Sequence, residues 1–555
     1  MTTSKDTDSL ETTERTCFGI PLSALAVCVA LSVTVGLIGM DGTIVGVATP
    51  EITTDLGSLG DVGWLGSAYF LAAAASQLVF GALNRVVPHK HVYIAGIFLF
   101  ELGCLLAGLA NTSTMCIVGR AFSGLGCSGV VSTSLVLVTE ILPPARLPLM
   151  IGVLGAMELV GQITGPLIGG ALTDNASWRW CFLINVPMGT VAGAVVFFLL
   201  RTHRKPWKTI FQELKLIDGI GILILTPAIA LILFVVQSGG NTFAWNSAES
   251  ISMLTVGFAL FVALVFWEHR KGEAAVIPLA LFKNRSISFA AAFAVTAGMA
   301  MALFDYYIPL WNQVIKGYSA ARSGILLLPL NACSAVGVMA GGLLANTIGR
   351  ANPVMLLGGT LTAIVSGLFS TITMASTDSR IMGFSALAGF AALASQQPIV
   401  VAHNAVETKL SPTAISMMLF SSMVGSAISL AIAQAVFLNK LQGNLRPVQG
   451  VDVDKIIRSG ATELRHIVDP SLLPKVLELY NLSIVQVFYM ALAAGIAMTV
   501  ASLLVKWTRI LEKKPKDAEN CAPSPVTSAG SGVTEPEDRE NTETTTETIV
   551  EKDKD

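Results

Sequence analysis

The sequence predicts an all-α, polytopic membrane protein. Of its 555 residues, 53% are hydrophobic and only 13% are charged, and the mean hydropathy is +0.67. Apolar runs of about 20 residues, the length that crosses a bilayer as a helix, recur between residues 21 and 507. The runs are continuous and do not alternate strictly between polar and apolar residues, which excludes a transmembrane β-barrel.

The apolar runs define about fourteen spans, and the charges between them indicate an orientation. Lys and Arg gather in alternate connections: residues 201–215 hold five, whereas residues 45–61 and 238–250 hold none. By the positive-inside rule both termini are predicted to be cytoplasmic, which requires an even number of spans. The spans are expected roughly at residues 21–44, 62–84, 92–110, 114–140, 149–172, 178–200, 217–237, 251–268, 287–310, 322–346, 353–374, 381–401, 413–437 and 484–507.

A weak internal repeat indicates two halves. A glycine-containing helix end leads into a basic turn twice, at residues 81–90 and at residues 342–350. Such repeats are characteristic of transporters, and here they predict two six-helix halves with two helices between them. The segment 472–482 is interpreted as a short amphipathic helix at the membrane interface. We expect a disordered cytoplasmic N-terminus (1–20), an N-terminal six-helix bundle (21–200), a cytoplasmic linker with two additional transmembrane helices (201–286), a C-terminal six-helix bundle (287–507) with a long outside loop (438–483), and a disordered cytoplasmic tail (508–555).

Ionisable side chains within the spans are the candidates for chemistry, because they are costly in lipid and usually functional. The five candidates for proton coupling are Asp41, Glu101, Arg120, Glu158 and Asp305. A carboxyl group in a low-dielectric cavity can exchange a proton near neutral pH, and an arginine there stays charged and must be paired. The alternative for Asp41 and Asp305 is a position in water at the end of a span, and for Glu101 it is an interhelical hydrogen bond.

No signature of a soluble enzyme is present. The chain has no Walker loop, no His/Glu metal motif and no Gly-x-Ser-x-Gly nucleophile elbow. Its eight cysteines are scattered without metal or disulfide spacing, and its net charge of −2 gives no basic field for nucleic acid. We therefore expect a protein that is not an enzyme and that has no cofactor, no metal and no nucleic-acid partner. Energy for any transport must then come from an ion gradient.

Residues 152–174 combine an apolar composition with many glycines. Gly161, Gly165 and Gly169 are four residues apart, so on a helix they form one smooth face that lets another helix approach closely. Pro166 removes a backbone donor and favours a bend. The pattern indicates a close contact between two parts of the protein, and the alternative is plain helix packing.

Five stretches of the sequence occur in a characteristic order. They are Met40-Asp41-Gly-Thr43 with Ala48-Thr-Pro50 in the first span, Asp61-Val-Gly63-Trp64-Leu-Gly66 at the start of the second, Gly119-Arg120-Ala-Phe-Ser-Gly124-Leu-Gly126 in the fourth, Gly161-Gln-Ile-Thr-Gly165-Pro166 with Gly169-Gly170 in the fifth, and Trp178-Arg179-Trp180 with Asn185-Val-Pro187 at the start of the sixth. This series resembles the motifs of the major facilitator superfamily, in particular its fungal fourteen-span drug:proton antiporters. The resemblance extends over residues 22–507.

The turn after the second span departs from the pattern of that family. The family's usual sequence there is Gly-x-Leu-x-Asp-Arg-x-Gly-Arg-Lys, but Arg85 takes the position of the Asp and Pro88 that of the second Gly. In the repeat after the tenth span, Asn346 takes the Asp position. We therefore interpret Arg85, Lys90 and Arg350 as parts of rigid basic cytoplasmic turns.

The resemblance implies a mechanism as well as a fold. It implies the major facilitator fold, with two six-helix bundles around a central cavity, two extra helices, and alternating access by rocking. In the family, the arginine that matches Arg120 is linked to proton coupling. The antiporter-motif helix, with Gly161, Gly165, Pro166, Gly169 and Gly170, is expected to seal the cavity between the halves when one side is closed. The expected activity is proton-coupled efflux of a bulky, mostly apolar toxin, secondary metabolite or antifungal drug.

Other functions stay open at this stage. A siderophore or basic amino-acid transporter could share the fold, although basic amino acids would require several carboxylates in the cavity. A non-transporting membrane sensor would carry a long structured cytoplasmic domain. We expect a monomer in the lipid bilayer of the plasma membrane, with the vacuolar membrane as the alternative. Three sequons, at Asn111, Asn175 and Asn481, fall on the predicted outside and are candidates for glycosylation.

Overall fold

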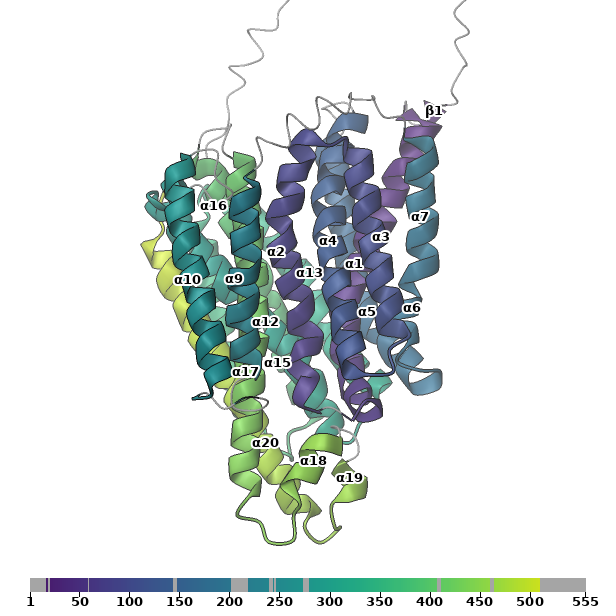
Figure 1. The fold of residues 1–555 in the computed structure, drawn as a ribbon, viewed down its shortest axis with the longest axis vertical. Coiled ribbons are helices and arrows are strands. Elements are labelled where there is room, and N and C mark those ends of the chain that lie inside the picture. The colour runs from purple at the N-terminus through teal and green to yellow at the C-terminus, as the bar shows by residue number, and fades with distance from the viewer. Residues whose placement is uncertain are drawn as a thin grey trace, which may run out of the picture. The chain divides into compact units, whose positions relative to one another are not determined.

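The computed structural model describes residues 16–17, 20–57, 59–142, 147–200, 218–238, 243, 246–272, 279–406, 411–459 and 464–509, and helices dominate it (Figure 1). A short antiparallel pair, β1 (Thr16–Cys17) and β2 (Ile20–Pro21), precedes the first helix. The termini predicted to be disordered lie outside the described residues, except for residues 16–17, 20 and 508–509. Within the predicted disordered N-terminus, residues 16, 17 and 20 are therefore part of a paired structure.

The first seven helices pack together into what we call the first group. α1 lies against α5 and α7, and α4 lies against both α2 and α3. The short 3-10 turn η1 (Leu59–Asp61) connects α1 to α2. The members of the group are α1 (Leu22–Asp55), α2 (Val62–Val86), α3 (His89–Gly108), α4 (Ser113–Ile141), α5 (Leu147–Asn175), α6 (Trp180–Leu183) and α7 (Asn185–Leu199).

The C-terminal helices form a second group around α12 and α20. α12 lies against α17 and α20, α14 lies against α20, and α13 lies against α15. Its members are α11 (Leu279–Phe282), α12 (Arg285–Val314), α13 (Ala320–Ile348), α14 (Asn352–Phe369), α15 (Asp378–Ala391), η4 (Ala392–Ala394), α16 (Gln397–Ala405), α17 (Ser411–Leu445), α18 (Val453–Ser459), α19 (Leu464–Ile467) and α20 (Leu473–Leu504).

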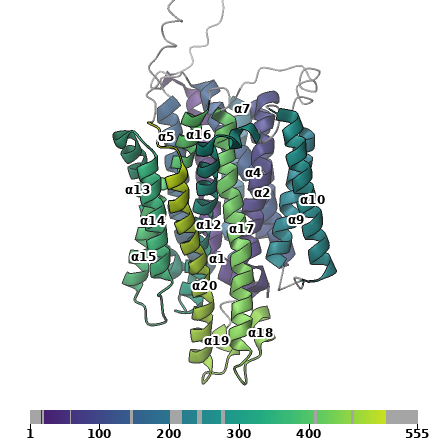
Figure 2. The ribbon, with the colours of Figure 1, turned by 90° about the vertical axis from the view of Figure 1, so that its left-hand side faces the viewer.

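Two additional helices, α9 (Gly219–Ser238) and α10 (Ala248–Lys271), pair with each other beside α2 and α17 (Figures 1 and 2). Asp218 fixes the start of α9, because its Oδ1 accepts hydrogen bonds from the backbone N of Gly221 at 3.0 Å and from Nε1 of Trp267 on α10 at 2.7 Å. A carboxylate at this position satisfies a backbone donor that the helix itself leaves unpaired.

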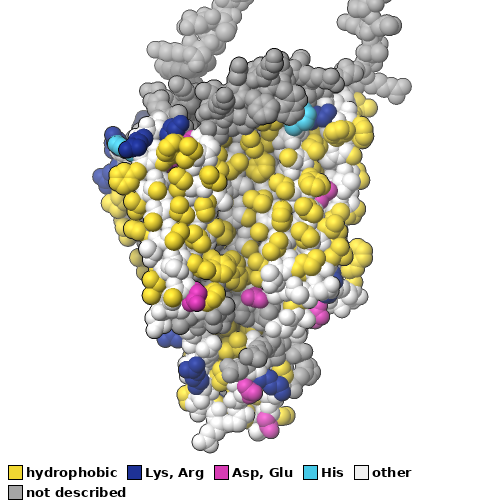
Figure 3. Space-filling view, in the orientation of Figure 1, with side chains coloured by type: hydrophobic (Ala, Val, Ile, Leu, Met, Phe, Trp, Pro, Cys, Tyr) yellow, Lys and Arg dark blue, Asp and Glu magenta, His cyan; other side chains and the backbone are white. Residues whose placement is uncertain are grey.

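Most of the expected spans are long apolar helices in the structure. Among the described residues, thirteen helical segments are long and apolar enough to cross a membrane. The helix α5 is not among these thirteen, but it is a continuous helix of 29 residues that lies along α1. Hydrophobic side chains form a broad band over the face seen in Figure 3, with charged side chains gathered above and below it.

Three spans differ locally from the prediction. The segment 472–482 is not a separate interfacial helix, because it forms the beginning of the 32-residue α20. The sixth span is divided into α6 and α7, and the twelfth into α15, η4 and α16. In the twelfth, Pro398 follows the break; proline fixes its own backbone and removes a donor, so a helix end or restart is favoured there.

The two groups meet mainly along three helix pairs, α1 with α12, α2 with α17, and α5 with α13, and α1 also contacts α13. The bundle has two distinct ends in Figure 1. We call the upper end, where α1 begins and α20 ends, the terminal end. The opposite end carries α18 and α19, and we call it the loop end.

Candidate functional site

An aspartate of α1 and an arginine of α4 form a buried ion pair within the first group. Nη1 of Arg120 donates a hydrogen bond of 2.6 Å to Oδ2 of Asp41, and both side chains are 0% exposed. Removing one partner of such a pair leaves an unpaired charge in the interior, which is strongly destabilising. The two charges are therefore held together by the cost of separating them.

Three further helices enclose the pair. Nδ2 of Asn185, at the start of α7, donates to Oδ1 of Asp41 at 3.3 Å, and Sγ of Cys104 on α3 lies 4.0 Å from the same oxygen. On the other side, Nε of Arg120 donates to the backbone carbonyl of Leu65 on α2 at 3.2 Å. The ion pair thus contacts every long helix of the first group except α5.

Glycines of α4 allow Arg120 to reach this position. A Cβ at Gly119 would lie 2.6 Å from the backbone N of Ala107 on α3, and a Cβ at Gly124 would collide with the backbone carbonyl of Tyr69 on α2. Because no side chain fits at either point, α4 approaches both neighbours at backbone distance. The guanidinium carbon of Arg120 then lies 4.4 Å from the ring centroid of Tyr69, a cation–π contact.

Asp41 does not lie near the end of its span, contrary to the sequence prediction. The apolar run suggests an end near residue 44, but α1 continues through Pro50 to Asp55. The first helix is therefore longer than its most hydrophobic part, and Asp41 lies near its middle. Its full burial excludes the alternative in which it faces water at a span end.

The remaining three candidates lie in different settings. Glu101 on α3 accepts a hydrogen bond of 3.1 Å from Oγ1 of Thr190 on α7, which is the interhelical bond given above as its alternative. Glu158 on α5 is half-buried, and Nε2 of Gln162 lies 3.5 Å from its Oε1. Asp305 on α12 is half-buried, and its Oδ1 has no hydrogen-bond partner among the described residues. Of the five candidates, the structure brings Asp41 and Arg120 into contact.

The glycine face of α5 packs against α1. A Cβ on Gly161, Gly165 or Gly169 would lie within 2.5 Å of an atom of α1. Because α1 belongs to the same group, the prediction that this face seals the boundary between the halves is wrong for these three glycines. Contact with the second group comes from Gly170, where a Cβ would lie 2.6 Å from the carbonyl of Ala320 on α13.

At the loop end, a side chain of the first group caps a helix of the second. The carboxylate of Asp174 on α5 accepts hydrogen bonds from the backbone N of Ala320 at 3.0 Å and of Ala321 at 2.8 Å. These are the first two residues of α13, whose N–H groups have no partner within the helix. A negative charge is also favoured there by the helix dipole.

Two glutamines make further connections between the groups near this end. Nε2 of Gln313 on α12 donates to the carbonyl of Val47 on α1 at 2.8 Å. Nε2 of Gln434 on α17 donates to the carbonyl of Leu59 in η1 at 3.0 Å. Side-chain to backbone hydrogen bonds thus connect α5 with α13, α1 with α12, and η1 with α17 at or near the loop end.

The start of α13 is also fixed within its own group. The hydroxyl of Tyr318, just before α13, donates to Oδ1 of Asp378 at 2.6 Å, and Nη2 of Arg322 donates to Oδ2 at 2.7 Å. The hydrogen bond to the carboxylate stabilises the neutral phenol and therefore raises the pKa of Tyr318.

Towards the terminal end, α5 and α13 separate. Gly152 and Gly170 on α5 are eighteen residues apart, which is five full turns, so they lie on the same face. Gly170 contacts α13, whereas a Cβ at Gly152 would meet none of the described residues within 4 Å. The same spacing occurs on α13, where Gly324 contacts α5 and a Cβ at Gly342 would likewise meet no described atom. The boundary between these helices is therefore closed at the loop end and open at the terminal end.

Comparison with known protein families identifies the fold. The family model described as Major Facilitator Superfamily matches residues 31–430. The chain belongs to the Major Facilitator Superfamily. Three similar proteins are the MFS-type transporter astH of Aspergillus oryzae (36% identical, covering 87% of this chain and 86% of that protein), the efflux pump roqT of Penicillium rubens (34%, 89% and 92%) and the rubrofusarin-specific efflux pump aurT of Gibberella zeae (34%, 88% and 90%). These names indicate an efflux transporter rather than an enzyme.

Solved structures agree on the fold. A bacterial homologue of the human lysosomal transporter Spinster, in an inward-facing and unoccupied conformation, matches with a TM-score of 0.64 at 16% identity, covering 88% of this chain and 99% of that one. A mutant of the nucleoside transporter NupG matches with a TM-score of 0.57 at 11% identity, covering 86% and 99%.

The basic turns of this superfamily member are held by histidine and lysine contacts. Nδ1 of His89, the first residue of α3, lies 2.6 Å from Oε1 of Glu140 on α4, and its Nε2 lies 2.7 Å from the carbonyl of Asn84 on α2. Nζ of Lys90 donates to the carbonyl of Leu200 at 2.8 Å. These contacts connect α2, α3, α4 and the end of α7 at the terminal end.

The other two basic residues of the predicted turns are Arg85 and Arg350. The side chain of Arg85 lies outside the described ones. Arg350 follows Gly349, which ends α13 in a left-handed conformation with φ of +71°. Glycine adopts this conformation without a steric penalty, which explains its place at the end of the helix.

One of the three predicted glycosylation sites is buried. Asn481 lies within α20, 6% exposed, where its Oδ1 accepts from Nε1 of Trp311 at 2.6 Å and its Nδ2 donates to the carbonyl of Ile372 at 3.2 Å. The prediction is wrong there, because the sequon does not show that its residues belong to a continuous packed helix. Asn111 and Asn175 are exposed at the loop end.

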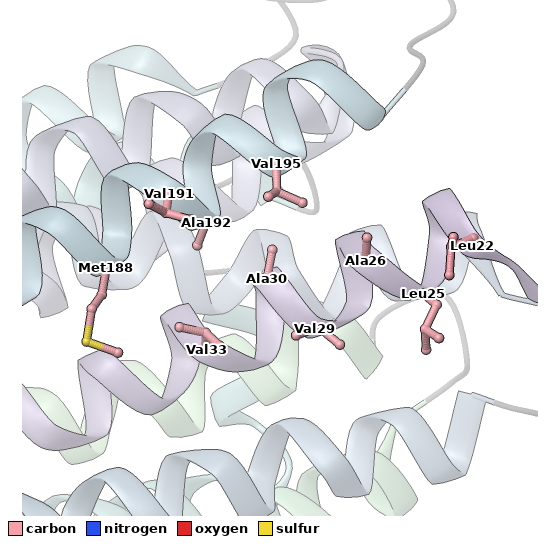
Figure 4. Close-up of a pocket in the computed structure, with 10 residues that line it drawn as sticks. All are labelled: Leu22, Leu25, Ala26, Val29, Ala30, Val33, Met188, Val191, Ala192 and Val195. Atoms are coloured by element: carbon pink, nitrogen blue, oxygen red, sulfur yellow. The ribbon is translucent and has the colours of Figure 1, made fainter. Parts of the chain in front are cut away.

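A lateral groove of about 400 Å³ lies between α1 and α7 towards the terminal end (Figure 4). Only apolar side chains line it, including Val29 and Val33 of α1 and Met188 and Val191 of α7. It therefore contains no group that could exchange a proton. Within the part of the chain that the structure describes, no three His, Cys, Asp or Glu side chains lie together as metal ligands would.

Several residues of the site were not singled out from the sequence. Asn185 falls within the sixth-span motif, so its contact with Asp41 could have been anticipated from that motif. Asp174, Gln313 and Gln434 carry no local signal, because their partners are backbone groups of distant helices.

Proposed function

We propose that this protein is a proton-coupled antiporter that exports a bulky, mostly apolar small molecule. The observation that carries the proposal is the buried pair of Asp41 and Arg120 in a helix group that contacts its counterpart near one end. The names of the relatives support efflux, and the name of one of them specifies rubrofusarin as the compound that it exports.

The pair supplies a group whose charge can change and a group whose charge cannot. Arginine remains protonated in proteins, whereas a carboxylate accepts a proton when its surroundings disfavour the charged form. Protonation of Asp41 removes the charge that compensates Arg120, so the guanidinium must find other acceptors. In the proposed cycle this change of partners connects proton binding to the movement between the two groups.

We assign the terminal end to the cytoplasm. Basic side chains of the described residues gather there, among them Lys90, Arg270, Lys271, Arg285 and Arg350, as the positive-inside rule requires. With this orientation, the opening between α5 and α13 faces the cytoplasm, and the loop end is the closed outer side. Residues 21–200 and 287–507 then act as the two bundles of the transporter, with α9 and α10 as the inserted pair.

The substrate is proposed from the relatives and from the scarcity of charge. Glu101, Glu158 and Asp305 are the half-buried carboxyls among the five candidates, and Glu101 is already hydrogen-bonded to Thr190. The cavity of a basic amino-acid transporter would require more free carboxylates. A weakly polar, mostly aromatic compound is recognised by shape and apolar contact. We assign the protein to the plasma membrane, because export from the cell requires that location.

Transport measurements in membrane vesicles test the proposal. Inside-out plasma-membrane vesicles from yeast cells expressing the full chain are supplied with rubrofusarin or rhodamine 6G, with and without an imposed proton gradient. Uptake that collapses when a protonophore removes the gradient supports antiport. Asp41→Asn and Arg120→Ala are each expected to abolish gradient-driven uptake, whereas Asp218→Asn, at a buried carboxylate of the inserted pair, is expected to retain it. If Asp41→Asn and Arg120→Ala transport as the unmodified protein does, the assignment of the coupling site is wrong.

A further inference from the structure

A tyrosine of the second group reaches the buried ion pair of the first. Tyr306 on α12 is 2% exposed, and the hydroxyl-bearing end of its ring lies against Gly66 on α2, where a Cβ would be 2.5 Å from its Cζ. The residue before Gly66 is Leu65, whose carbonyl accepts the hydrogen bond from Nε of Arg120. The phenol and the guanidinium therefore meet at the same point of α2, where they interact electrostatically.

Both groups have unused hydrogen-bonding capacity. Arg120 uses Nη1 for Asp41 and Nε for Leu65, but its Nη2 has no acceptor among the described residues. The hydroxyl of Tyr306 is also buried and makes no hydrogen bond of standard geometry there, although it lies close enough to the guanidinium of Arg120 for a weak polar contact. An unsatisfied buried donor or acceptor costs free energy, so a small movement that joins the two groups is favourable.

We propose that Tyr306 is a positioning residue that connects the charge state of the Asp41–Arg120 pair to the contact between the two helix groups. The inference rests on the proposed proton antiport and names the residue that transmits it. While Asp41 is ionised, it is the main partner of the guanidinium. When Asp41 takes up a proton, Arg120 keeps its charge, and the hydroxyl oxygen of Tyr306 becomes its additional acceptor.

The direction of the coupling between Asp41 protonation and loop-end closure follows from the fact that Tyr306 belongs to the second group. It can accept from Arg120 only while its ring lies against Gly66 of α2, as it does in this structure with the loop end closed. Protonation of Asp41 therefore strengthens closure of the loop end, and deprotonation weakens it. If the loop end faces the outside, a proton that binds Asp41 from the outside favours closure of the outer side. Antiport requires this order, in which proton binding from outside precedes the change to the state open to the cytoplasm.

Other titratable groups near the pair could contribute to a pH response. Glu158 and Asp305 are the carboxyls among them, so Glu158→Gln and Asp305→Asn belong in the experiment as controls. The titratable side chains with electrostatic contact to the pair, to Tyr306 or to their immediate neighbours are Tyr69 of α2, Cys104 of α3, Cys116 and Cys127 of α4, Glu158 of α5, Cys181 of α6 and Asp305 of α12.

The next residue provides a matched control. Tyr307 is also fully buried, and its hydroxyl is likewise without a hydrogen-bond partner among the described residues. Its ring, however, packs at 6.2 Å from that of Phe437 on α17, within the second group. Tyr307→Phe thus removes a buried hydroxyl from the same helix turn without touching the ion pair.

The test measures the conformation of the full chain against pH. Spin labels are placed at Asn111 and Ser379, exposed loop-end positions of the first and second groups, and their distance distribution is recorded in lipid nanodiscs between pH 5 and pH 8. Labelling uses a background in which Cys17, Cys333 and Cys521 are replaced by serine. In the parent and in Tyr307→Phe, the short-distance population is expected to grow several-fold as the pH falls.

Variants at Tyr306 and Asp41 distinguish the role of Tyr306 from the proposed proton antiport. Tyr306→Phe is expected to lose most of the pH response, and Tyr306→Gln, which restores an oxygen acceptor, to regain part of it. Asp41→Asn, which mimics the protonated form, is expected to stay closed at every pH. A Tyr306→Phe protein that responds like the parent refutes the role of Tyr306 while leaving the proposed antiport intact. A parent without a pH response, together with Asp41→Asn that behaves like it, refutes both.

Discussion

Removing the carboxylate of Asp174 should open the loop end. In the structure this carboxylate accepts hydrogen bonds from the first two backbone N–H groups of α13, at 3.0 and 2.8 Å, across the boundary between the groups. Loss of a helix cap costs roughly 0.5–2 kcal/mol. Because Asp174 is exposed, we take about 1 kcal/mol, which lowers the ratio of closed to open molecules roughly fivefold.

Distance measurements give this ratio directly. With spin labels at Asn111 and Ser379, Asp174→Ala should increase the long-distance population about fivefold relative to the short one. Asp174→Asn should fall between the two, because the amide oxygen still accepts a hydrogen bond but carries no charge. Glu478→Ala, which removes an exposed carboxylate paired with Lys475 inside one group, is the control and should change nothing.

One result would refute the reasoning. If Asp174→Ala leaves the distance distribution as it is in the parent, the carboxylate is replaced by water at no net cost, and the closed state is held by the other contacts between the groups, including the hydrogen bonds of Gln313 and Gln434. An equal shift in Glu478→Ala would show instead that the loop end responds to charge in general.

Three further predictions concern positions where the contact partners are known. Gly165→Leu should reduce the yield of folded protein and lower its Tm, because the new side chain overlaps α1. Gly155→Leu is the control and should fold normally, because a Cβ there meets none of the described residues. A Gly165→Leu protein that folds but is uncoupled would show that the contact between α5 and α1 moves during transport. Gly66→Ala should shift spin-label distances towards the loop-end-open state, because a methyl group there displaces the ring of Tyr306; an unchanged distribution would mean that α12 adjusts without moving. Asn481→Ala should destabilise the protein by about 1–3 kcal/mol, because the buried amide loses its hydrogen bonds. On a gel, without glycosidase treatment, the variant should run with the parent protein, because Asn481 carries no glycan. A difference in mobility between the two would show that the sequon is used.

The membrane helices follow closely from the sequence because hydropathy reports the energy of each segment in lipid, independently of its neighbours. This is also why Asp41 and Arg120 could be recognised one at a time, as charges in apolar surroundings. Their pairing depends on α1 and α4 lying together, a property of the whole helix arrangement. For a related reason the apolar run predicts a shorter first helix than α1, whose last turns are less hydrophobic but are buried by contact with other helices.

Small-residue spacing predicted a close approach but not the partner. Gly161, Gly165 and Gly169 accept a neighbouring backbone on one side of α5, and any helix could supply it. Only the three-dimensional arrangement shows that α1 does so, and that Gly170 faces the other group. The sequence does not indicate the role of Asp174, because a carboxylate at the end of a span is ordinarily solvated and its partner is a helix N-terminus nearly 150 residues away.

The eighteen-residue glycine spacing sets the scale of the movement. At about 1.5 Å per residue, the closed and open positions on α5 are about 27 Å apart along the helix axis. Widening the terminal end by a further 8 Å or so, enough for a flat ring system, then requires a tilt of only about 17° between α5 and α13. Reversing that tilt would bring Gly152 and Gly342 to the partner helix in the way that Gly170 and Gly324 meet it now. In the proposed cycle, two rigid helices therefore expose either end of the path in turn by exchanging the contacts at Gly170 and Gly324 for contacts at Gly152 and Gly342, and neither helix has to unfold.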